Sequence, residues 1–187
     1  MPLNHGSSYA ELTAEQAELI GRFVIEWSNI EFLLSDILAR LLMSPNFVAR
    51  VFTDSMTAFA LQEALNKAIR FHRDRYHFAV IPVPVLERLS TMLSAVDELR
   101  GMRNRFSHFC WTRSTDEAIF GTGFSAYLPS DKRHKRDVSV LSVEEIRAAH
   151  KKAWDLVENL SAFLLAIPHT TEDDALRAKG LSIPEES

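Results

Sequence analysis

Residues 85–108 have the sequence VLERLSTMLSAVDELRGMRNRFSH, in which apolar residues recur at alternating steps of four and three. This spacing places them along one side of an α-helix. The side comprises Val85, Leu89, Met92, Val96, Leu99, Arg103 and Phe106. Arg103 interrupts an otherwise apolar seam, so the stretch predicts a packed helix that carries a guanidinium on its buried side.

Two more long helices are predicted on either side of this stretch. Thr13 and Gln16 form a capping box before a helical run that ends at Ser44-Pro45, and Ser142 and Glu145 form another before a run that ends at Pro168. Residues 47–77 show a weaker helical face with a break near 53–55. The expected class is therefore mainly α, with four to five helices.

The period changes between residues 109 and 141. Short β-prone runs, at 109–112, 118–120, 124–127 and 138–140, are separated by turn-forming residues. They predict a small antiparallel insert before the last long helix, with Gly121 and Gly123 as turn residues. We expect one helical domain over 1–167 and an acidic tail over 168–187, with a short helix at about 174–179.

Composition limits the possible partners and compartments. The 187 residues carry a net charge of -4, which argues against a protein that coats nucleic acid through general basicity. Cys110 is the single cysteine and the first residues lack a signal-peptide pattern, so a cytoplasmic location is expected. Five charges within residues 19–43 exclude a lipid-exposed membrane helix, and no membrane partner is expected.

A second charge lies where an apolar residue is expected. On the first long helix Glu31 shares a stripe with Trp27, Leu34 and Leu38. Burying a lone charge costs several kcal/mol, so we expect Glu31 to face Arg103 across a helix interface. Such a pair has two interpretations: a salt bridge that fixes helix register, or the support of a functional site.

The residues after Arg103 favour a functional site. Arg103 is suited to bind a phosphate, Asn104 to orient a hydroxyl or water, and His108 to exchange a proton near neutral pH, while Glu31 holds Arg103. This set predicts metal-free cleavage of RNA, by attack of a 2′-hydroxyl on the adjacent phosphorus. No metal ion or cofactor is expected.

Basic and aromatic residues surround His108 and are candidates for binding single-stranded RNA. They are Arg100, Arg105, Trp111 and Arg113. The densest basic run, residues 132–136, is either a solvated loop or a further phosphate contact.

The motif Arg103-Asn104-Arg105-Phe106-Ser107-His108 resembles that of the HEPN superfamily, an Arg often followed by Asn, Asp or His, then a His after four to six residues. The likeness extends to Trp27-Ser28-Asn29-Ile30-Glu31 on the first long helix and to a final helix that completes the bundle. It implies an up-and-down helical bundle that forms a homodimer, and in many members a metal-independent endoribonuclease of toxin, antiviral or RNA-processing systems. An antitoxin or other protein partner would fit such systems.

Two other functions are compatible with the same residues. One is a non-catalytic helical dimerisation or interaction module, in which the Arg-Glu-His cluster only fixes packing. The other is a helical bundle that binds a nucleotide or another small molecule, because a phosphate-sized pocket would use the same side chains.

Overall fold

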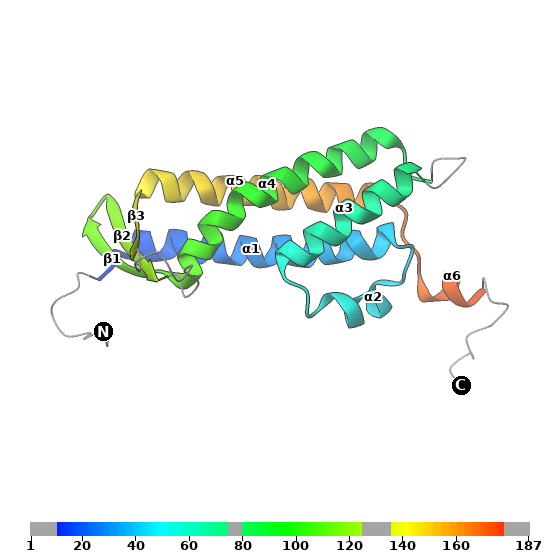
Figure 1. Ribbon diagram of the computed structural model, residues 1–187, viewed down its shortest axis with the longest axis horizontal. Helices are drawn as coiled ribbons and strands as arrows, with labels where there is room; N and C mark the ends of the chain where they lie inside the picture. Colours follow the sequence, from blue (N-terminus) through cyan, green and yellow to red (C-terminus); the bar gives the residue numbers. More distant parts are fainter. Residues whose placement is uncertain (1–10, 75–79, 125–135, 178–187) are drawn as a thin grey trace, which may run out of the picture. The chain divides into compact units, whose positions relative to one another are not determined.

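The computed structural model describes residues 11–74, 80–124 and 136–177. It is mainly helical with a small antiparallel sheet, which confirms the expected class (Figure 1). The elements are α1 Ala14–Leu41, α2 Asn46–Thr53, α3 Ala58–Asp74, α4 Val83–His108, β1 Cys110–Thr115, β2 Ala118–Phe124, β3 Arg136–Ser142, α5 Val143–Ala166 and α6 Glu172–Arg177. None of the helices in the described ranges has the length and apolarity needed to span a bilayer.

The chain divides into two compact units. Unit 1 takes in residues up to 27 together with 97–155, and unit 2 takes in 28–96 together with residues from 156 onward. The helices α1, α4 and α5 contribute residues to both units. The predicted single domain over 1–167 stays a prediction.

Both predicted capping boxes are present in unit 1. At the start of α1, the Thr13 N–H donates to Gln16 Oε1 over 2.9 Å and the Gln16 N–H donates to Thr13 Oγ1 over 3.2 Å. At the start of α5, the Ser142 N–H donates to Glu145 Oε2 over 2.7 Å and the Glu145 N–H donates to Ser142 Oγ over 3.1 Å. Each box satisfies main-chain donors that have no partner inside the helix.

The three strands form an antiparallel sheet in the order β1-β2-β3. The prediction that Gly121 and Gly123 form a turn is wrong, because both lie inside β2. A Cβ atom on Gly121 would lie 2.6 Å from the ring of Trp111, and one on Gly123 would lie 2.6 Å from the ring of Phe109. Glycine is needed here for the close approach of two aromatic rings.

Of the strand predicted at 124–127, Phe124 ends β2 and 125–127 lie outside the described residues.

A series of aromatic rings forms part of the core of unit 1. Phe23 of α1 meets Phe106 of α4 edge to face at 5.1 Å between centroids. Phe106 lies 5.7 Å from Trp111, and Trp111 stacks on Phe109 at 5.7 Å. The first strand is thereby packed against the last turns of α4.

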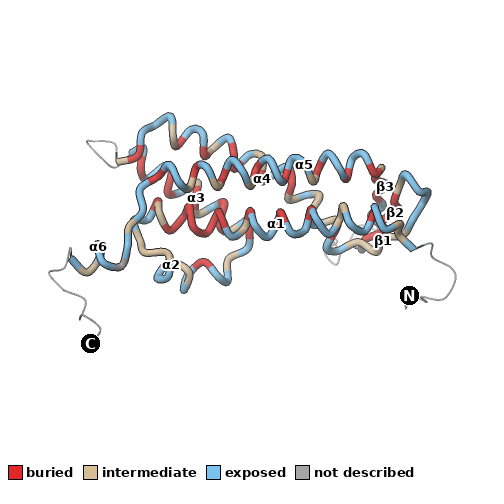
Figure 2. Tube along the Cα trace, turned by 180° about the vertical axis from the view of Figure 1, so that it is seen from behind, coloured by how far each residue is buried: buried red, intermediate tan, exposed pale blue. Residues whose placement is uncertain are grey.

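The fully buried residues of unit 2 come from α1, α3, α4 and α5, and Figure 2 colours buried residues along these helices red. The largest are Ile30, Leu34, Ile37, Leu65, Leu86, Leu89, Leu93, Leu160 and Phe163. Hydrogen bonds add to this packing: Gln62 Nε2 of α3 donates to the Leu93 carbonyl of α4 over 2.9 Å, and Arg40 donates to the Ile167 carbonyl over 3.1 Å.

Two helix boundaries differ slightly from the expected ones. The helix α4 begins at Val83, inside the segment predicted to be extended, because Pro84 falls in the first turn, where a missing N–H costs nothing. The helix α6 spans Glu172–Arg177, while the last two positions of the predicted helix at 174–179 lie outside the described residues.

Candidate functional site at the end of the fourth helix

The predicted motif forms the C-terminal end of α4, within unit 1. The helix ends at His108, and the Phe109 N–H still donates to the Arg105 carbonyl over 2.9 Å. The chain then enters β1 at Cys110, which stops the helix. His108 is exposed on this last turn, so its imidazole is accessible to a ligand.

Asn104 and His108 are four residues apart on α4, so their side chains lie on the same side of the helix, one turn from each other. Both are exposed. Arg103 Nη1 donates to Asn104 Oδ1 over 3.4 Å, which brings the guanidinium to the edge of this exposed face. Asn104 therefore contacts Arg103 and shares its side of the helix with His108.

Arg103 is less buried than its position on the seam suggests. It is half-buried, whereas Leu99 and Phe106, its neighbours along the seam, are 3% and 8% exposed. The guanidinium therefore does not need a buried counterion to offset its desolvation.

Glu31 belongs to unit 2, so its predicted pairing with Arg103 of unit 1 stays a prediction. Within unit 2, Glu31 is half-buried and lines a small cavity of about 180 Å³ together with Arg50 and Asp54. Arg50 is bound there to Asp36, with 3.0 Å between Nη2 and Oδ1.

Arg105 and Trp111 support each other locally. Arg105 Nη1 donates to Ser139 Oγ of β3 over 3.3 Å, and the Arg105 carbonyl accepts a hydrogen bond from Trp111 Nε1 over 3.1 Å. Trp111 is half-buried, with its ring against Gly121 and in the aromatic series of unit 1. The Trp111 side chain that we expected to stack on RNA thus has a packing role, and only part of its ring is accessible.

The other two predicted RNA-binding arginines have acidic neighbours. Arg100 Nη2 lies 2.8 Å from Asp97 Oδ1, and Arg113 Nη1 lies 3.3 Å from Asp116 Oδ1. These carboxylates offset much of the positive charge that each arginine presents to a phosphate. In the basic run at 132–136, residues 132–135 lie outside the described residues.

Sequence reasoning missed two features of this site. One is Ser139, 8% exposed, which holds Arg105 from a strand more than thirty residues away and gives no local signal. The other is the shared face of Asn104 and His108, which helical spacing could have revealed. Within the described ranges, no three His, Cys, Asp or Glu side chains gather closely enough to hold a metal ion.

No protein-family model, no curated protein and no solved structure matches this chain. The fold and the site together define a mainly helical protein in which half-buried Arg103 and exposed Asn104 and His108 lie at the end of one long helix. The function of these residues must be argued from their own chemistry.

Proposed function

We propose that this chain is a HEPN-like protein that binds single-stranded RNA at the end of α4 and cleaves it without a metal ion. The exposed His108, one turn from Asn104, which in turn accepts a hydrogen bond from Arg103, carries the proposal. An accessible imidazole next to a phosphate-binding group is the minimum requirement for acid–base chemistry on a phosphodiester.

In the proposed reaction, His108 accepts the proton of an RNA 2′-hydroxyl while the 2′-oxygen attacks the adjacent phosphorus. The bond from phosphorus to the 5′-oxygen of the next nucleotide breaks, and that oxygen takes a proton from water. The products are a 2′,3′-cyclic phosphate and a 5′-hydroxyl. Arg103 stabilises the negative charge that builds up on the phosphoryl oxygens, and Asn104 orients the attacking hydroxyl.

Two further elements belong to the proposal: Glu31 supports Arg103, as their positions on two apolar stripes predict, and two copies of the chain form a dimer, as the resemblance to HEPN proteins implies. Neither is needed for the chemistry at His108, which depends on one chain alone. The test of the reaction can therefore be separated from the test of the dimer.

The decisive experiment incubates the purified full chain with mixed single-stranded RNA in EDTA. Replacing His108→Ala is expected to slow cleavage by about 10²- to 10⁴-fold, the usual contribution of a positioned acid or base. A matched control is His169→Ala, because His169 is also exposed but lies outside α4. The same oligonucleotide with 2′-deoxy sugars should resist cleavage, and equal cleavage of RNA by wild type and His108→Ala would refute the proposal.

A further inference from the structure

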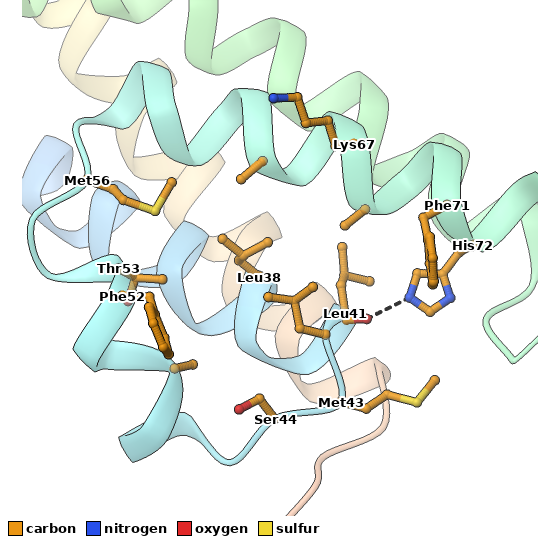
Figure 3. Close-up of a pocket in the computed structure, with 14 residues that line it drawn as sticks. Leu38, Leu41, Met43, Ser44, Phe52, Thr53, Met56, Lys67, Phe71 and His72 are labelled. Carbon is orange, nitrogen blue, oxygen red and sulfur yellow. Dashed lines mark hydrogen bonds between the residues drawn. The ribbon is translucent and has the colours of Figure 1, made fainter. Parts of the chain in front are cut away.

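Unit 2 contains an open apolar groove at the C-terminal end of α1, against α2 and α3. Its volume is about 680 Å³, within the range of sites that bind small molecules. Its apolar lining consists of Leu38, Leu41, Leu42, Met43, Ala49, Phe52, Met56, Ala64, Ala68 and Phe71 (Figure 3). Met43 and Met56 form part of the wall, and their flexible side chains can adapt to the shape of a ligand.

Three of the four polar residues in the lining already have hydrogen bonds within the protein. The Ser35 hydroxyl donates to Thr53 Oγ1 over 2.6 Å, and Ser44 Oγ donates to the Pro45 carbonyl over 3.4 Å. His72 Nε2 lies 2.7 Å from the Leu41 carbonyl, the contact drawn as a dashed line in Figure 3. The floor of the groove therefore favours apolar groups.

Lys67 is the fourth polar residue and, among the described residues that line the groove, the only charged one. Its side chain is exposed, and Figure 3 shows its ammonium at the outer edge of the group, away from Leu38 and Leu41. None of the ion pairs formed by the described residues includes Lys67, although Glu63 precedes it by one turn of α3. No carboxylate is among the lining residues that belong to the described part of the chain.

We propose that this groove binds a free amphiphile with an unbranched apolar chain and an anionic head group, such as a long-chain carboxylate. The chain would lie among the apolar side chains, and the head group would meet the Lys67 ammonium at the rim, where water still solvates it. Charge complementarity favours an anionic head group, because the described residues of the lining include one cation, Lys67, and no anion. This ligand site is independent of the proposed RNA chemistry, whose residues on α4 lie in unit 1.

The test measures binding of decanoate to the purified full chain by calorimetry, below the concentration at which decanoate forms micelles. We expect saturable binding with one site per chain, and about tenfold tighter binding of dodecanoate, because each buried methylene adds to affinity. Decan-1-ol should bind more weakly than decanoate, and decylammonium should bind most weakly of the three.

Variants distinguish the head-group contact from the apolar floor. Lys67→Glu should weaken decanoate binding by about tenfold or more and favour decylammonium, whereas Lys67→Arg should preserve decanoate binding. The matched control is Arg70→Glu, an exposed cation one turn further along α3 that does not line the groove. Ala64→Trp, at a half-buried position of the lining, should abolish binding of all three ligands.

Three outcomes would overturn the proposal. The first is equal binding of decanoate and decan-1-ol that Lys67→Glu leaves unchanged. The second is binding only to vesicles of anionic phospholipid, with none to free decanoate, which would make the groove a membrane contact. The third is a concentration-dependent dimer that Ala64→Trp dissociates, which would show that a second copy covers the groove. Circular dichroism of each variant confirms that it is folded.

Discussion

At Gly121 the absence of a side chain is a packing requirement. Gly121 pairs with Trp111 across the two strands, and the Trp111 ring lies over the Gly121 backbone. Glycine weakens a strand because it leaves a gap and costs backbone entropy, but a cross-strand aromatic ring fills that gap. At Gly123 the ring of Phe109, the residue before β1, lies equally close to the position of a Cβ atom.

Replacing Gly121→Ala is expected to lower the free energy of unfolding by about 1–3 kcal/mol, the range for overpacking a well-filled site. The added Cβ would lie 2.6 Å from Trp111 and would displace the ring. Urea denaturation measures the loss, and the near-ultraviolet circular dichroism of tryptophan reports the shifted ring.

The matched control is Gly101→Ala, since a Cβ there meets no atom within 4 Å in the interior of α4. That change should raise stability by about 0.5–1 kcal/mol, because alanine favours the helix. A Gly121→Ala protein as stable as the wild type would contradict the packing argument.

A second prediction about a single residue concerns Arg103. It is half-buried, and its one hydrogen bond to a described side chain is the 3.4 Å contact with Asn104, so Arg103→Ala should change the free energy of unfolding by no more than about 1 kcal/mol. Under the proposed function the same variant loses RNA cleavage. A loss of about 3–5 kcal/mol on urea denaturation would instead show that a buried partner has been left uncompensated, which would favour the packing role.

Among the helices and strands, the start of α5 shows how a local hydrogen-bond pattern makes the stability of the fold depend on pH. The backbone N–H of Ser142, and next its hydroxyl, hydrogen-bond the Glu145 carboxylate and lower the pKa of that carboxyl. Because the ionised carboxylate is favoured in the folded state, the capping box contributes its full share of the free energy of unfolding above the pKa of an unfolded Glu, about 4.3. Its contribution falls as the pH drops through the lowered folded pKa.

Ser142→Ala should therefore reduce the free energy of unfolding by about 1 kcal/mol at pH 7, the typical value of an N-cap. Glu145→Gln should also be less stable than the wild type at pH 7, and this difference should disappear as the pH falls from about 5 to 3. Urea titrations at several pH values measure both effects, with Glu158→Gln, an exposed site on the same helix, as control. A difference between Glu145→Gln and wild type that does not vary with pH would contradict the role of the carboxylate.

The elements that sequence predicted correctly are those set by contacts three or four residues apart. Both capping boxes, the long helices and the break between α2 and α3 depend on such spacing. The local sequence predicts a turn at Gly121 and not its true role. That role depends on Trp111, which is ten residues away and is brought near only by the strand register. Likewise, the bond from Arg105 to Ser139 depends on how β3 pairs in the sheet, and no local pattern indicates it.

For the whole molecule, charge placement matters more than net charge. The chain carries -4 overall, so RNA would be held by a few local cations and repelled elsewhere. At the end of α4, Arg103 and Arg105 have neutral hydrogen-bond partners, whereas Arg100 and Arg113 lie beside aspartates. Of the four arginines near His108, the structure pairs Arg100 and Arg113 with aspartates and places Arg105 within electrostatic reach of Glu145.

This difference predicts a shallow salt dependence for RNA binding. With two or three phosphate contacts, the slope of log K against log of salt concentration should be about -1.4 to -2, given roughly -0.7 for each contact with a single strand. Fluorescence anisotropy of a labelled oligonucleotide at several salt concentrations measures this slope. Arg103→Ala should make it shallower by about 0.7, whereas Arg113→Ala, already paired with Asp116, should change it less. A wild-type slope near -4 would contradict this count, because it would require phosphate contacts beyond the end of α4.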